Sequence, residues 1–141
     1  MEPRQLFVEA ARSKVGAPYR WGAKGPDLFD CSGFICFCLR AAGFQIPDIS
    51  SRNLAEIFKS KRVERNAATA GCIFFYGKQP VHHVMACLTR WPDGHVILIG
   101  ARGGNEKTTD CEIAYRSGSM VDVVTSDYWL SEFSFAADPF K

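Results

Sequence analysis

The chain has 141 residues, and 17 Lys and Arg against 15 Asp and Glu give it a net charge of +2. This near balance gives no electrostatic reason to expect nucleic acid as a partner, although a mildly basic surface suits an anionic polymer. The length fits one domain spanning residues 1–141, with a hydrophobic core of its own. No apolar run reaches transmembrane length, and Met1–Leu6 does not resemble a signal peptide, so we expect cytoplasmic synthesis and no membrane insertion.

The first predicted element is an amphipathic helix. Apolar residues recur at helical spacing from Pro3 to Val15, and Gly16 ends the pattern. The following segment, Ala17–Asp30, is predicted to be a loop. It is too long for a simple connection, and loops of this kind are often functional.

The most apolar helix of the chain is predicted to begin close to Cys31. Apolar residues continue from Phe34 to Ala42 until Gly43, and Asp30 is a suitable N-cap. Because the N-terminus of a helix favours a thiolate, we expect the pKa of Cys31 to fall within about 3.5 to 7.5. Cys31 is therefore a candidate nucleophile; the alternative is a buried structural cysteine.

The second half of the chain changes from helical to strand periodicity. A third helix is predicted over Ser51–Phe58, and Lys59–Asn66 is expected to be a charged surface connector. Helices followed by an antiparallel sheet indicate the α+β class. The strands are predicted at Cys72–Tyr76, Val81–Thr89, His95–Ala101, Met120–Thr125 and Phe133–Ala137, with a β-turn at Trp91–Gly94 between the second and the third.

The six cysteines are interpreted as reduced residues. Four of the five besides Cys31 lie in apolar helix or strand patterns, and no pair has the spacing of a metal site. They are Cys31, Cys36, Cys38, Cys72, Cys87 and Cys111.

A histidine at the start of the strand Val81–Thr89 gives Cys31 a candidate partner. A cysteine on a helix tip and a histidine on a distant strand are typical of sites where imidazole activates a thiol. His82 and His83 are adjacent, and neighbouring strand residues point to opposite faces, so only one of them can address Cys31.

Four segments together resemble the NlpC/p60 family of papain-like cysteine peptidases, which hydrolyse peptide bonds in the stem peptides of bacterial peptidoglycan. They are Ala17–Gly22, Phe29–Phe34, Ala70–Phe75 and His83–Val84. The resemblance implies a papain-like fold, in which the nucleophile helix packs on a small antiparallel sheet. It favours His83 as the catalytic histidine, because Val84 and an apolar strand follow it directly.

The resemblance also implies roles for individual residues. Cys31 would be the nucleophile, His83 the base, and Tyr19 an oxyanion or substrate-binding residue. Asp30 and Ser32 would bind a free amino group of the stem peptide, and no metal or organic cofactor is required. The implied scissile bond joins D-Glu to diaminopimelate or lysine. Cys72 stands where the family commonly has an aspartate, at a position that we interpret as structural.

The third catalytic residue of the family has no clear counterpart. His95 follows His83 by 12 positions, but the predicted hairpin places it about 17 to 20 Å away at about 3.3 Å per residue. Gly100 is expected beside the start of the histidine strand, and glycine has no side chain to offer. We therefore favour a Cys–His dyad. A backbone carbonyl, a water molecule, Arg102 or Asn105 are the alternatives.

The segment Ala101–Thr109 lacks the ending of a phosphate-binding loop and a following helix, so it is expected to be a mobile loop. Its Ala-Arg-Gly-Gly-Asn stretch and the C-terminal Asp138–Phe140 most resemble the phage and prophage branch of the family. Delivery to the wall by a phage or a secretion machine is then expected, with a possible phage structural partner. Two alternatives stay open: an interbacterial amidase toxin with an immunity protein, and a non-catalytic phage tail or wall-binding module.

Overall fold

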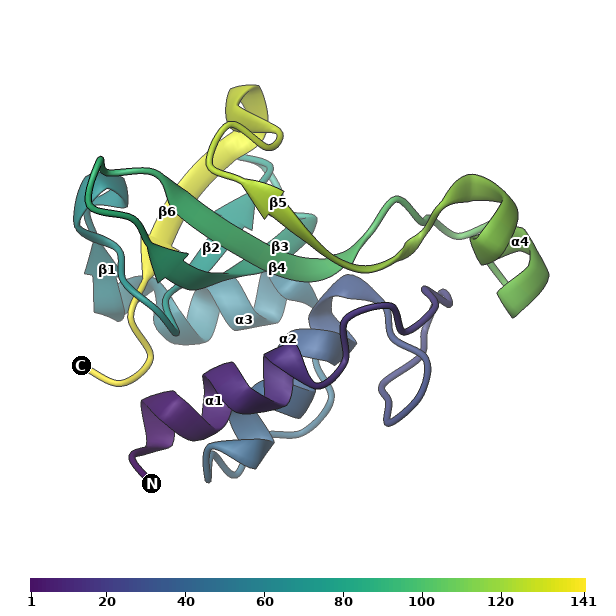
Figure 1. Ribbon diagram of the computed structural model, residues 1–141, viewed down its shortest axis with the longest axis horizontal. Coiled ribbons are helices and arrows are strands. Elements are labelled where there is room, and N and C mark those ends of the chain that lie inside the picture. Colours follow the sequence, from purple (N-terminus) through teal and green to yellow (C-terminus); the bar gives the residue numbers. More distant parts are fainter.

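The computed structural model describes residues 1–141 and has the predicted α+β architecture. Six antiparallel strands form one sheet in the order β1-β6-β2-β3-β4-β5. Figure 1 shows α1, α2 and α3 together beside the sheet, with α4 at the far end of the β4–β5 arm. The helices are α1 (Pro3–Arg12), α2 (Cys31–Ala41), α3 (Ser51–Phe58) and α4 (Cys111–Ser117). The strands are β1 (Arg62–Val63), β2 (Ile73–Tyr76), β3 (His83–Arg90), β4 (Val96–Arg102), β5 (Met120–Thr125) and β6 (Phe133–Ala137).

The core lies on both faces of the sheet. Strand residues alternate between the faces, so Phe75 packs with the helices while Phe74 and Tyr76 belong to a second cluster of buried residues. The cluster on the helix side contains most of α2, whose buried residues include Phe34, Ile35, Cys36, Cys38 and Leu39. This burial fixes α2, and with it the helix N-terminus, against the middle of the sheet.

Several predicted elements are confirmed and others need correction. The helix Ser51–Phe58 and the strands Met120–Thr125 and Phe133–Ala137 have the predicted limits. The first helix ends at Arg12 rather than Val15. The charged connector contains the short edge strand β1, which pairs with β6.

The prediction that no helix follows the loop 101–109 was wrong. Helix α4 follows it, capped by Asp110, whose carboxylate accepts a hydrogen bond from the Ile113 N–H. The helix ends at Ser117, and its C-cap Gly118 has φ 69°. Glycine favours this left-handed conformation, which commonly ends helices. Only Ala114 of α4 is buried, so the helix has no apolar stripe for a periodicity analysis to detect.

No helix of the protein combines the length and the apolar character that crossing a membrane requires.

Candidate active site

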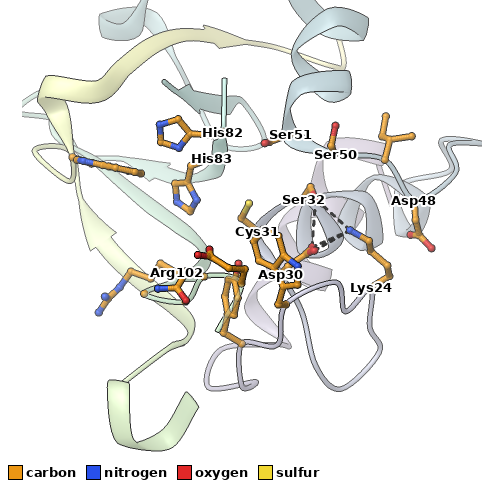
Figure 2. Close-up of a pocket in the computed structure, with 18 of the residues that line it drawn as sticks. Lys24, Asp30, Cys31, Ser32, Asp48, Ser50, Ser51, His82, His83 and Arg102 are labelled. Atoms are coloured by element: carbon orange, nitrogen blue, oxygen red, sulfur yellow. Dashed lines mark hydrogen bonds and ion pairs between the residues drawn. The ribbon is translucent and has the colours of Figure 1, made fainter. Parts of the chain in front are cut away.

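The first residue of α2 and the first residue of β3 meet in one pocket. Cys31 and His83 both line a cavity of about 840 Å³. In Figure 2 the sulfur of Cys31 is directed toward the imidazole of His83. The backbone N–H of Val84, the residue after His83, is one of the groups that lower the pKa of Cys31. The two residues that the sequence proposes as nucleophile and base are therefore neighbours in space.

The start of α2 is fixed by its cap and by the loop that precedes it. The Gly33 N–H donates a hydrogen bond of 2.7 Å to Asp30 Oδ1, so Asp30 is the predicted N-cap. A Cβ on Gly33 would lie 2.3 Å from the carbonyl oxygen of Ala23, so only glycine permits this close approach of the loop. The loop and the helix N-terminus thus form one packed unit around Cys31.

The expected low pKa of Cys31 was wrong. Burial raises the pKa of Cys31 to about 11, and the nearby Asp30 carboxylate acts in the same direction. The N–H groups of Val84 and Ser32 and the Lys24 ammonium lower the pKa of the thiol, but by less. Desolvation therefore outweighs the helix N-terminus, and the resting nucleophile is a thiol.

His83 is a buried, neutral base. Its side chain is 8% exposed, and burial followed by repulsion from His82 lowers its pKa to about 4. His83 Nε2 lies 3.1 Å from the hydroxyl oxygen of Tyr128, at hydrogen-bond distance. His82 is exposed at the rim of the same pocket and packs against Trp129. The structure therefore brings His83, rather than His82, into the buried position beside Cys31.

Tyr19 forms part of the pocket wall, as the sequence predicts. Its ring is 4% exposed, and its N–H donates to the Ser119 carbonyl oxygen at 3.1 Å. Burial is the main cause that raises the pKa of Tyr19, and the next cause is Cys31. The hydroxyl is accordingly a neutral donor on a residue that lines the same pocket as Cys31, which is compatible with either an oxyanion or a substrate-binding role.

Gly104 sets the position of the Tyr19 ring. A Cβ on Gly104 would lie 2.1 Å from Tyr19 Cδ1, so the Gly104→Ala substitution must displace the ring. We expect a loss of stability of about 1 to 3 kcal/mol from overpacking and a fall in any hydrolytic rate of about tenfold or more. Thermal unfolding and wall hydrolysis measure the two effects.

Tyr19→Phe is the matched comparison for Gly104→Ala, because it removes the hydroxyl and leaves the ring in place. A Gly104→Ala protein with unchanged stability and rate would show that the ring has room to move.

Asp30 and Ser32 also line the pocket, but they already hold a cation. The Lys24 ammonium lies 3.0 and 3.2 Å from the two carboxylate oxygens of Asp30 and 3.4 Å from Ser32 Oγ (Figure 2). Asp30 is 8% exposed and Ser32 is 5% exposed. A substrate amine that binds Asp30 must therefore share the carboxylate with Lys24 or displace it.

The expectation that Gly100 stands beside the start of the histidine strand was wrong. Ala86 pairs with Ile99 beyond a bulge between Cys87 and Thr89, so Gly100 lies level with Met85, two residues after His83, and packs against it. Continuing this register places Arg102, at the end of β4, level with His83. The guanidinium of Arg102 lies 2.6 Å from Asp122 Oδ2, and arginine offers no acceptor to an imidazole N–H.

The other candidates for the third position do not contact His83. His95 lies in the β3–β4 turn, where its exposed side chain is 3.1 Å from Asp93, in agreement with the predicted hairpin. Asn105 lines the pocket, but its amide oxygen accepts a hydrogen bond from the Lys107 N–H. Cys72 is buried and its sulfur accepts a hydrogen bond from the Thr69 N–H, in line with the predicted structural position.

Sequence reasoning missed the aromatic residues that follow β5. Tyr128 and Trp129 lie in the turn before β6, 45 residues or more after His83, and both line the pocket. Trp129 has φ 44°, a conformation that is rare for a residue with a bulky side chain. No local motif marks this turn; its irregular backbone becomes visible only in the folded chain.

All six cysteines are unpaired. No group of three or more His, Cys, Asp or Glu side chains is arranged to hold a metal ion.

Comparison with known proteins agrees with this geometry. The sequence model of the NlpC/P60 family matches residues 16–136, which include Tyr19, Cys31 and His83. The chain belongs to the NlpC/P60 family. A probable endopeptidase of Corynebacterium glutamicum is 46% identical over 52 residues, which cover 37% of this chain and 25% of that protein. The chain thus spans a quarter or less of the length of the curated relatives that it matches first.

Solved NlpC/P60 structures share the fold of the whole chain. The NlpC/p60 domain of the peptidoglycan hydrolase SagA is 24% identical with a TM-score of 0.68, over 96% of this chain and 97% of that one. RipD from Mycobacterium tuberculosis is 17% identical with a TM-score of 0.69, over 99% and 98% of the two chains. RipD is described as a non-catalytic domain protein adapted to peptidoglycan binding, so this fold occurs both in hydrolases and in binding proteins.

Proposed function

We propose that this NlpC/P60 protein is a cysteine peptidase that hydrolyses an amide bond in the peptide stem of peptidoglycan. The proposal rests on one observation: the Cys31 thiol and the buried, neutral His83 imidazole line the same open pocket. Relatives named as probable endopeptidases support the same reaction class. We place the scissile bond between D-Glu and diaminopimelate or lysine, as the family resemblance implies.

The reaction begins with a neutral pair. The pKa of Cys31 is about 11 and that of His83 is about 4, so a thiol faces an unprotonated imidazole at neutral pH. His83 accepts the thiol proton as the sulfur attacks the amide carbonyl carbon, which gives a tetrahedral oxyanion. The imidazolium then donates this proton to the amine leaving group, and a thioester to Cys31 remains.

The oxyanion is stabilised by donors that the fold already directs at the pocket. The N–H of Cys31 is at the first position of α2, where the helix itself does not use it. The neutral hydroxyl of Tyr19 is the second donor in this proposal. Water, deprotonated by His83, attacks the thioester carbonyl carbon, and the acid product leaves with the thiol restored.

Asp30 and Ser32 keep their proposed role in binding a stem-peptide amine, now with Lys24 as a competitor. Because Lys24 already neutralises Asp30, an incoming ammonium gains less from this carboxylate than from a free one. Three expectations stay predictions from the sequence: cytoplasmic synthesis, delivery by a phage or a secretion system, and an immunity partner.

The test uses purified, reduced protein and intact sacculi of the diaminopimelate and lysine types. We expect the protein to release fragments cut within the stem peptide, and mass spectrometry identifies the bond. The Cys31→Ala variant should lose this release by more than about 10³-fold, because the nucleophile is gone. Cys111→Ala is the matched control, since Cys111 is an exposed cysteine on α4.

Failure to release fragments from either wall type would contradict the peptidase proposal. Wild-type protein that cosediments with sacculi without cutting them would instead act as a binding module, the property described for RipD.

A further inference from the structure

We propose that Tyr128 is the positioning residue of the catalytic histidine and takes the place of a polar residue on the strand next to His83. The Tyr128 hydroxyl oxygen lies 3.1 Å from His83 Nε2. With Nε2 bound to Tyr128, Nδ1 is the ring nitrogen that is left for Cys31. The catalytic effect of Tyr128 rests on the proposed function, in which His83 is the base, whereas its effect on the tautomer of His83 does not.

The residue of β4 level with His83 has no side-chain acceptor to offer. Arg102 is the residue of β4 that comes level with His83, and its guanidinium is directed to Asp122 at 2.6 Å. Arginine has five N–H donors and no acceptor, so it cannot accept a hydrogen bond from an imidazole N–H. Arg102 and Tyr128 line the same pocket, and the positive charge of Arg102 lowers the pKa of Tyr128, against the larger effect of burial.

The turn that carries Tyr128 is held in place by several contacts. The Tyr128 N–H donates to the Thr125 carbonyl oxygen at 2.9 Å, and Arg65 donates to the carbonyl oxygen of Ser126. The Tyr128 ring packs edge-on against Tyr76, with centroids 5.6 Å apart. The hydroxyl is thus presented to His83 by a fixed turn.

The direction of the hydrogen bond determines whether His83 can act as a base. When Nε2–H donates to Tyr128, Nδ1 carries the lone pair that accepts the thiol proton. When the phenol donates to Nε2, Nδ1 carries a hydrogen and the imidazole cannot take a proton from Cys31. The proposed role therefore requires Tyr128 to accept, and it selects the tautomer with the hydrogen on Nε2.

Tyr128→Phe tests this role, because it keeps the ring packing on Tyr76 and removes only the hydroxyl. We expect kcat on wall peptides to fall about 10- to 100-fold with little change in KM. Tyr128→Gln offers an amide oxygen and is expected to recover part of kcat. Tyr115→Phe is the matched control, since Tyr115 lies on α4 with 87% of its surface exposed.

A spectroscopic measurement separates this proposal from the proposed function. Nitrogen NMR of His83 in the Cys31→Ala background should show the Nε2–H tautomer, and Tyr128→Phe should shift the equilibrium toward Nδ1–H. An unchanged tautomer together with an unchanged kcat would overturn the role of Tyr128. If the tautomer shifts but the wild-type protein releases nothing from sacculi, Tyr128 still positions His83 and only the proposed function fails.

Discussion

Replacing His83 with glutamine is expected to lower wall-peptide hydrolysis at pH 7 by about 10³- to 10⁴-fold. The reason is the protonation state of the nucleophile. The pKa of Cys31 is about 11, so without a base the reaction must use the small fraction of protein in which the thiol has already ionised. At pH 7 that fraction is about 10⁻⁴, since each pH unit below the pKa lowers it tenfold.

The same reasoning predicts how pH changes the defect. In the His83→Gln protein the thiolate fraction rises about tenfold per pH unit, so the loss should shrink steadily from pH 7 to pH 10. The wild-type protein should show no such rise, because His83 removes the proton during the attack. Initial rates of fragment release across this range measure both slopes.

His82→Gln is the matched control for His83→Gln, because the adjacent histidine lies exposed at the rim of the same pocket. Alkylation of Cys31, followed at that residue by peptide mapping, gives a readout that needs no substrate. Mapping is required because Cys111 is also exposed. Equal alkylation rates of Cys31 at pH 7 in the wild-type and His83→Gln proteins would show that His83 does not activate the thiol.

The sequence alone was sufficient to predict that Cys31 and His83 form one site. Cys31 follows a good N-cap and starts a run of apolar residues, and His83 starts an apolar strand, so both positions are set by local patterns. The burial that these patterns imply also reverses the expected pKa of Cys31. A helix N-terminus stabilises a thiolate only within its first turn and only modestly, whereas removal of the thiol from water acts on the full charge.

The environment of His83 could not be read from the sequence because it depends on register and on an irregular turn. The bulge between Cys87 and Thr89 shifts the β3–β4 register by one residue, so Arg102 rather than Gly103 comes level with His83. The hydroxyl of Tyr128 lies at hydrogen-bond distance from the imidazole, on the turn between β5 and β6. Neither a bulge nor a left-handed tryptophan at position 129 has a sequence signature comparable to the apolar period of a helix.

The burial of His83 predicts a specific acid sensitivity of the fold. The pKa of His83 is lowered from 6.5 to about 4, so between these values the unfolded chain binds a proton that the folded chain does not. The free energy of unfolding therefore falls as the pH falls through this window, by about 1.4 kcal/mol per pH unit and about 3 kcal/mol in total. This is a large share of a total stability that is typically about 5 to 15 kcal/mol.

Denaturant unfolding between pH 7 and pH 4 measures this loss, and the His83→Gln protein provides the comparison. Glutamine does not titrate, so its unfolding free energy should be nearly constant where the wild-type value falls. Some exposed carboxylates also have a lowered pKa, and their contribution to the unfolding free energy is lost at the acid end of the range. This loss is the same in both proteins, so it cancels in the comparison. These residues are Glu56, Asp93 and Asp127. Parallel curves for the two proteins between pH 6.5 and pH 4 would show that the folded chain protonates His83 as readily as the unfolded chain does, and that burial does not lower the pKa of this imidazole.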